Sequence, residues 1–241
     1  MTSKSVQRIH CKNLWMPGTK NADKRKRKGE NNMNDTCKHS IVVMGGSFNP
    51  PTRAHLTLMT AAIDGVGANH GIFVPSNHAY VKRKMSKTDT PDAIYSEEER
   101  LAMLSVMCAE DKRLSADPLE YGYKIRSGNS LVTMDAIQEK NPCAELYFLF
   151  GGDKLKTFTK WKTFDEFVQK YRIIVFKREE NDPEKEINKT AALREHRDAF
   201  VILPAPVGIE NISSTMVRER LALGESVEDY LYPAVWKLIC K

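Results

Sequence analysis

Residues 41–56 of the chain read IVVMGGSFNPPTRAHL, and this stretch decides the fold class. Its short apolar start, Ile41 to Met44, predicts a buried strand. Two glycines follow, and their lack of a side chain lets the backbone come close to a ligand. A polar turn then leads to a helix that opens near Thr52–His55, whose free N–H groups and dipole favour an anion in front of it. The stretch therefore predicts a phosphate site with one imidazole, His55, beside it.

Further apolar runs recur along the chain with helical segments between them. The runs are continuous rather than alternating, which is typical of parallel strands buried on both faces. They span residues 72–74, 146–150, 173–176 and 200–203. Helices are indicated by a capping box at Ser96, by residues 130–140, and by residues 213–223 before Gly224. This alternation predicts an α/β fold, a doubly wound Rossmann-like parallel sheet with helices on both faces.

Two segments are harder to assign. Residues 226–240 are expected to form a last helix that is broken near Pro233. Residues 177–198 are charged and lack apolar periodicity, so we expect a surface excursion there.

Charge divides the chain into a tail and a body. Residues 1–40 hold ten Lys and Arg against three Asp and Glu, whereas the rest holds 27 against 28. The tail is also poor in apolar residues, so we expect disorder over residues 1–39 and one globular domain over residues 40–241. A body so close to neutral gives no reason to expect a nucleic-acid partner.

The tail carries a run of five basic residues, Lys24 to Lys28, which is typical of a nuclear address. The alternative is a solvated tail without a receptor, in a cytoplasmic protein. A mitochondrial presequence fits less well, because the first residues show no clear amphipathic period.

Cysteine usage and hydropathy exclude several classes of protein. The five cysteines are scattered and form no C-x-x-C pair. We therefore expect reduced thiols in an intracellular protein, with neither a zinc site nor a disulfide framework. No apolar stretch approaches the ~18 residues that a membrane span needs, so no membrane partner is expected.

A second candidate anion site lies near the C-terminus. Ser213, Ser214 and Thr215 open a helix, and their hydroxyls join its free N–H groups. Arg218 follows Thr215 by about one turn and can direct its fork of donors at the same anion. Taken alone, the string also fits an ordinary N-cap with a surface arginine.

Four more residues are candidates whose ordinary alternatives stay open. Asp153, after Gly151 and the run 146–150, lies where a ribose diol is often held, and it also suits a helix N-cap. Trp161 fits either stacking on a flat ring or packing in the core. Lys82 fits a phosphate contact or a solvated loop, and Thr133 is an ordinary early helix residue.

Together these motifs resemble the nicotinamide/nicotinate mononucleotide adenylyltransferases of the T/H-x-x-H nucleotidyltransferase superfamily. The resemblance runs from about residue 40 to the C-terminus. Three segments carry it: residues 46–55, residues 151–161, and residues 212–218, which are close to the family's I-S-S-T-x-x-R signature.

The resemblance implies a role for each candidate. The implied ATP-binding residues are Gly46, Ser47, Phe48, Thr52, His55, Ser213, Ser214, Thr215 and Arg218. The implied mononucleotide-binding residues are Ser47, Lys82, Thr133, Gly151, Asp153 and Trp161. Three of these, His55, Lys82 and Arg218, are the implied catalytic residues because they stabilise charge on the phosphates.

The sequence departs from the family pattern in two places. Bacterial members often have His and Gly where this chain has Thr52 and Ala54, so His55 acts with less help. The segment 127–133 is one residue longer than usual, which bears on the assignment of Thr133.

The implied reaction joins ATP and nicotinamide mononucleotide (NMN) or nicotinate mononucleotide (NaMN), giving NAD or deamido-NAD and pyrophosphate. Mg²⁺ is expected to travel with the ATP phosphates, without a metal site built by the protein. The sequence does not distinguish NMN from NaMN and leaves a homo-oligomer open. The alternatives are a pantetheine-phosphate adenylyltransferase, a cytidylyltransferase, or a non-catalytic nucleotide-binding protein.

Overall fold

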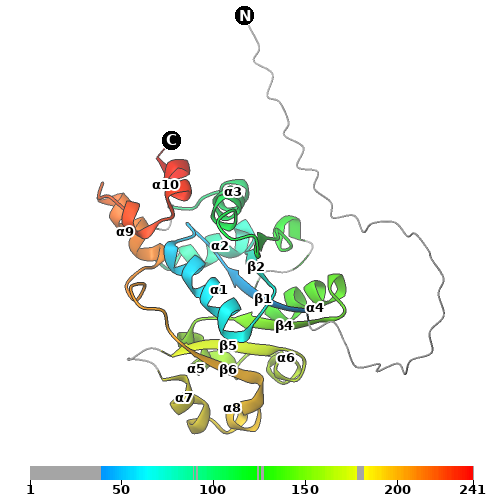
Figure 1. Cartoon of the computed structure of the whole chain (residues 1–241). Helices are drawn as coiled ribbons and strands as arrows, with labels where there is room; N and C mark the ends of the chain where they lie inside the picture. Colours follow the sequence, from blue (N-terminus) through cyan, green and yellow to red (C-terminus); the bar gives the residue numbers. More distant parts are fainter. Residues whose placement is uncertain are drawn as a thin grey trace, which may run out of the picture. The chain divides into compact units, whose positions relative to one another are not determined.

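A six-stranded parallel sheet forms the centre of the molecule (Figure 1). The computed structural model describes residues 39–88, 90, 92–123, 125, 128–177 and 182–240. The strand order is β3-β2-β1-β4-β5-β6, and each neighbouring pair is parallel. The strands are β1 (His39–Gly46), β2 (His70–Pro75), β3 (Leu114–Ala116), β4 (Ala144–Leu149), β5 (Arg172–Lys177) and β6 (Phe200–Pro204).

Helices connect the strands and cover both faces of the sheet (Figure 1). The α-helices are α1 (Arg53–Val66), α2 (His78–Met85), α3 (Glu97–Cys108), α4 (Ser130–Lys140), α5 (Leu155–Phe158), α6 (Phe164–Lys170), α7 (Pro183–Lys189), α8 (Ala191–Glu195), α9 (Ser214–Ala222) and α10 (Pro233–Ile239). Single 3₁₀ turns are η1 (Tyr121–Tyr123), η2 (Gly152–Lys154), η3 (Arg197–Ala199) and η4 (Glu228–Tyr230). None of the described helices combines the length and apolarity that crossing a membrane would require.

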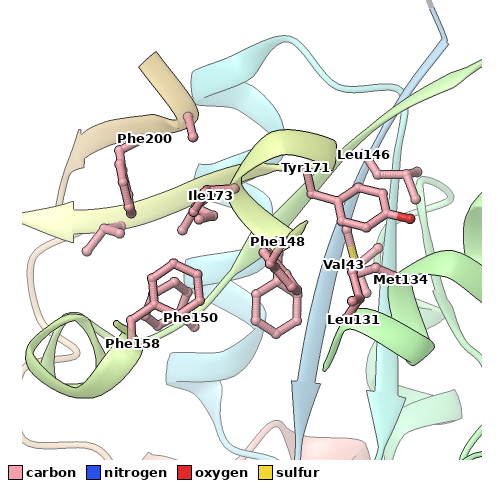
Figure 2. Packing of buried hydrophobic residues seen from close by; sticks show 14 of the residues in the cluster. Val43, Leu131, Met134, Leu146, Phe148, Phe150, Phe158, Tyr171, Ile173 and Phe200 are labelled. Atoms are coloured by element: carbon pink, nitrogen blue, oxygen red, sulfur yellow. The ribbon is translucent and has the colours of Figure 1, made fainter. Parts of the chain in front are cut away.

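Strand β1 shows why the apolar runs are continuous. Ile41 and Val43 face one core, with residues of α4 to α8, and Val42 and Met44 face the other, with residues of α1, α3, α9 and α10. Successive side chains of a strand point to opposite faces, so a strand covered on both sides is apolar throughout. Figure 2 shows the first core, in which phenylalanines such as Phe148 pack edge-on or tilted against one another among aliphatic side chains.

The order of the strands decides where a ligand can bind. From β1 the chain adds β2 and then β3 on one side of the sheet. It then returns to add β4, β5 and β6 on the other side of β1. At such a reversal a crevice opens beyond the carboxyl ends of the strands. In this chain the reversal lies between β1 and β4, so the glycine turn that follows β1 lies at the crevice.

The predicted fold class is confirmed, and so are the five strands and the helices expected from capping signals. Strand β3 was missed because three residues form no recognisable run. Two expectations were wrong. Pro233 begins α10 instead of interrupting a helix, as its fixed φ and missing N–H suit a first helical position. The surface excursion contains α7 and α8, whose Ile187 and Leu193 are fully buried in the core.

The predicted tail is outside the described part of the chain except for its last residue. His39 begins β1, one residue earlier than the predicted boundary of the globular domain. Residues 1–38, with the basic run, lie outside the described residues, so the predicted disorder and nuclear address stay predictions.

Candidate active site

A cavity of about 470 Å³ lies where the fold predicts a crevice. Its floor comes from the carboxyl ends of β1, β4 and β5, including Gly45, Gly46, Leu149 and Phe176. The turn after β1 and the starts of α1, α4 and α9 form its walls. Helix starts and a glycine turn converge on one space, which is the arrangement that binds phosphates.

The turn after β1 holds a strained shape through tertiary contacts. Phe48 has a φ of 45°, uncommon outside glycine, and is only 2% exposed. The Asn49 amide fixes the turn against the segment before α3, donating to the Ala93 carbonyl at 2.8 Å and accepting from the Tyr95 N–H at 2.9 Å. A β-carbon on Gly46 would lie 3.1 Å from the buried Phe48 ring, so this ring would have to shift to admit any other residue.

His55 is held in one orientation at the start of α1. The backbone N–H of Thr52, the N-cap residue, donates to Nδ1 of His55 at 3.0 Å. The Thr52 hydroxyl oxygen lies 2.8 Å from the same nitrogen. Because a backbone N–H can only donate, Nδ1 is the acceptor, and a neutral imidazole then carries its proton on Nε2.

The surroundings also keep this imidazole uncharged. Burial, and then the positive charge of Lys84, lower the pKa of His55 to about 4. The ring lines the cavity and packs edge-on against Phe48, with 5.1 Å between ring centroids. His55 is therefore a neutral hydrogen-bond donor near pH 7, available to an acceptor in the cavity.

The start of α9 is tied to the turn after β1. Ser213 caps the helix by accepting from the Met216 N–H at 3.1 Å, and the Ser214 hydroxyl donates to the Pro50 carbonyl at 2.8 Å. These contacts bring the C-terminal predicted motif beside the N-terminal one, although about 160 residues separate them in the chain. Ser213, Ser214 and Thr215 all line the cavity.

Arg218 connects three segments from a buried position. It is 4% exposed, and its Nη1 donates to the Asn49 carbonyl at 2.8 Å. Its Nη2 and Nε donate to the hydroxyls of Thr215 at 3.2 Å and Thr90 at 3.1 Å. A guanidinium has five N–H donors, so donors remain for a ligand in the cavity that Arg218 lines.

On α2, the cavity is lined by a lysine other than the predicted one. Lys84 lines it, and its Nζ donates to the Ser47 hydroxyl at 3.4 Å, whereas the exposed Lys82 is not part of the lining. Residues two apart on a helix point in nearly opposite directions, so α2 cannot direct both at one space. The structure thus places Lys84 in the lining, and the phosphate contact predicted for Lys82 stays a prediction.

The far end of the cavity is aromatic. Trp161 lines it while packing edge-on against Phe158, with ring centroids 5.0 Å apart, so the core and ligand interpretations are compatible. Gly151 lines the cavity too and precedes η2. Asp153 lies within η2, and its side chain is outside the described part of the structure.

Thr133 lies behind the wall instead of in it. It is 2% exposed, and its hydroxyl donates to Oε1 of Glu120 at 2.8 Å. Glu120, itself 5% exposed, is the residue that lines the cavity, and its buried Oε2 has no hydrogen-bond partner among the described residues. The sequence shows that the segment before Thr133 is longer than in the family pattern, which bears on the assignment of Thr133. It gives no signal for Glu120.

Comparisons with known proteins agree with this geometry. Residues 43–220 match the family model described as "Cytidylyltransferase-like". A "Probable nicotinate-nucleotide adenylyltransferase" of Lachnoclostridium phytofermentans is 30% identical over 83% of this chain and 96% of its own length. A protein of the same description from Shouchella clausii is 29% identical over 83% of this chain and 93% of its own length.

The fold comparison points the same way. The solved structure of Plasmodium falciparum nicotinic acid mononucleotide adenylyltransferase complexed with APC superposes with a TM-score of 0.63. The superposition covers 84% of this chain and 94% of the solved chain. Because the two are only 17% identical in sequence, the likeness is evidence for the fold alone. The family model and the 30% identical relative are evidence for family membership. They show that this chain belongs to the cytidylyltransferase-like family, in its nicotinamide/nicotinate mononucleotide adenylyltransferase branch.

Proposed function

We propose that this chain transfers the adenylyl group of ATP to NMN or NaMN, producing NAD or deamido-NAD and pyrophosphate. The observation that carries the proposal is the convergence of the β1 turn, the Nε2–H of His55 and Arg218 on one cavity with an aromatic far end. The first three suit a triphosphate, and the aromatic end around Trp161 suits a flat ring.

The chemistry needs alignment and charge stabilisation more than it needs a protein nucleophile. A 5′-phosphate oxygen of the mononucleotide attacks the α-phosphorus of ATP, and the bond from that phosphorus to the bridging oxygen breaks to release pyrophosphate. The incoming phosphate is already an anion, so no base is required. The protein's contribution is to hold both phosphates in line and to stabilise the charge that develops.

Side chains from three helices, α1, α9 and α2, fit that task. The Nε2–H of His55 can donate to an α-phosphate oxygen without changing its protonation state near pH 7. Arg218 and the hydroxyls at the start of α9 suit the leaving pyrophosphate. Lys84, beside the Ser47 hydroxyl, supplies a cation on the opposite wall.

Mg²⁺ enters this proposal as part of the MgATP substrate. Among the described residues, no group of three or more His, Cys, Asp or Glu side chains is placed to hold a metal ion. The cavity wall is instead rich in N–H, hydroxyl and cationic donors, which suit phosphates that carry their own Mg²⁺. Titration with EDTA, with and without added MgCl₂, tests this part of the proposal.

The deciding measurement is pyrophosphate release from MgATP with NMN, NaMN or phosphopantetheine, each against a control without acceptor. Turnover with either pyridine mononucleotide is expected, and the ratio of the two kcat/KM values gives the preference. Turnover with phosphopantetheine alone would assign the chain to the pantetheine-phosphate enzymes. If a folded sample that binds ATP released nothing with any acceptor, a non-catalytic role would replace the proposal.

The nuclear address is a separate proposal that rests on Lys24 to Lys28 in the sequence. Its test compares the distribution of tagged full-length chain with that of a chain lacking residues 1–38. An unchanged distribution would refute it and favour the cytoplasm.

A further inference from the structure

A buried arginine lies behind the turn after β1, outside the cavity. Arg100 on α3 is 0% exposed, and its Nη1 donates to the Ser47 carbonyl at 2.8 Å. Its Nε donates to the Tyr95 carbonyl at 3.3 Å, and its carbon Cζ lies 5.5 Å from the centroid of the Tyr121 ring. Its Nη2 is buried and has no hydrogen-bond partner within the described part of the chain.

The charge of Arg100 is not balanced by a contacting carboxylate. Within the described residues no ion pair includes Arg100. Glu97 and Glu98 act on it only through longer-range attraction from the solvent side of α3. Burying a charge without a contacting counter-ion costs free energy. The hydrogen bonds to the Ser47 and Tyr95 carbonyls stabilise the fold, but a neutral donor could also make them, so they do not explain the charge.

Its position relative to the turn does give a reason. Arg100 donates to the Ser47 carbonyl, and Arg218 donates to the Asn49 carbonyl. Two arginines from two helices therefore bind alternate carbonyls of the turn. Phe48, between them, has the left-handed backbone. Carbonyl oxygens tied back to cations do not face an anion in the cavity. The unpaired positive charge behind them also acts on any anion bound there, because the protein interior screens weakly.

We propose that Arg100 is a positioning residue for anion binding, which shapes the turn and adds positive potential from behind it. It touches no substrate. The proposal rests on the proposed function only in taking the anion to be the ATP triphosphate.

The test compares Arg100→Met, Arg100→Lys and the control Lys112→Met, which removes one positive charge from an exposed position just beyond α3. Calorimetry measures binding of ATP, inorganic tripolyphosphate and NMN or NaMN to the full chain, and thermal unfolding gives Tm. We expect Arg100→Met to weaken ATP and tripolyphosphate binding by about tenfold or more, and binding of the mononucleotide, whose single phosphate carries less charge, by about threefold or less. Its Tm should change little, because the loss of a donor to the Ser47 and Tyr95 carbonyls opposes the gain from removing a buried charge.

Arg100→Lys keeps the charge but loses the fork, so its ATP affinity should fall between those of Arg100→Met and the wild type. If Arg100→Met does not fold, this variant decides: a loss of about threefold or more in ATP affinity supports the proposal, and an unchanged affinity overturns it. With folded Arg100→Met, wild-type ATP affinity overturns it. So does a lower Tm with equal losses for both substrates, because that pattern marks a structural role.

Failure of the proposed function would look different. Wild-type chain would then bind ATP yet release no pyrophosphate with any mononucleotide, while the binding data on the Arg100 variants would stand on their own.

Discussion

The two ends of the cavity are built on different principles. At the phosphate end, polar groups are linked to one another: Arg218 has three hydrogen-bond partners, and Nδ1 of His55 is occupied by Thr52. At the aromatic end, Trp161 packs against core phenylalanines, and the polar Glu120 has one partner, Thr133. One end is specified by directional bonds and charge, the other by shape.

This difference explains how each end responds to change. Preorganised donors act on charge that develops during the reaction, so removing one lowers the rate steeply. Stacking and apolar packing bind the ring equally before and during the reaction, so removing them mainly raises KM. Variants at the two ends should therefore separate into kcat effects and KM effects.

The largest effect is expected for Arg218→Ala, which removes donors to the phosphates and releases the Asn49 carbonyl. We expect kcat/KM for ATP to fall about 10³-fold and the free energy of unfolding to drop by about 1–3 kcal/mol. Steady-state kinetics and urea unfolding measure the two. The control is Arg220→Ala, two residues on along α9, where the side chain pairs with Glu225 at the surface. A loss below about threefold in kcat/KM would remove Arg218 from the site.

Two substitutions divide the roles of the His55 ring nitrogens. His55→Asn can keep an acceptor for the Thr52 N–H but loses the donor in the cavity, so kcat should fall about 10²-fold with little change in stability. His55→Gln can keep a donor at the reach of Nε2 but loses the acceptor near the backbone, so stability should fall more than kcat. Kinetics and urea unfolding of both variants check this. The reverse ranking would contradict the assigned orientation of the ring.

The low pKa of His55 also predicts a dependence of stability on pH. With a folded-state pKa of about 4 and an unfolded value of 6.5, the unfolded chain takes up this proton first as pH falls. Stability should therefore decline between pH 6.5 and 4, by about 3 kcal/mol from this group. The difference between wild type and His55→Asn in urea unfolding, followed from pH 8 to pH 4, isolates the effect. Parallel curves would refute it.

The same contrast between the two ends explains what the sequence could predict. Residues 41–56 form a strand, a glycine turn and a helix start, which place backbone donors by local rules. Ser213 to Arg218 likewise place donors at the start of a helix. At the aromatic end, Gly151 and Trp161 come from one segment and were candidates, whereas Glu120 joins them from a distant segment and carried no signal. The sequence could not show that Lys84 lines the cavity, because this depends on how α2 is rotated, which is set by the burial of Val81 and Met85.

The fold shows the same division. Helix bounds with capping residues, such as Ser96 and Ser213, were predictable because the signal is local. β3, α7 and α8 were not, since each is short and depends on the sheet already being in place. Ile187 and Leu193 are the only large aliphatic side chains on the short helices α7 and α8, and only the tertiary structure shows that they are buried.

A smaller and different effect is expected at the aromatic end. Trp161→Ala should raise KM for the mononucleotide about tenfold, within the range for loss of one stacking partner, and leave KM for ATP and kcat nearly unchanged. Trp161→Phe should lie between. Trp236→Ala, on the opposite side of the sheet, controls for the loss of a half-buried tryptophan. An equal rise in KM for ATP would mean that the two ends are not independent.

The smallest effect on activity is expected at Thr133, whose hydroxyl reaches the cavity only through Glu120. Thr133→Val leaves both oxygens of a buried carboxylate without a donor, so the free energy of unfolding should fall by about 1–3 kcal/mol. Thr133→Ser keeps the donor and should retain most of that stability. Because Thr133 does not line the cavity, KM for the mononucleotide should rise only about two- to threefold in Thr133→Val. A rise as large as that of Trp161→Ala, without loss of stability, would instead place the Thr133 hydroxyl in direct contact with the ring.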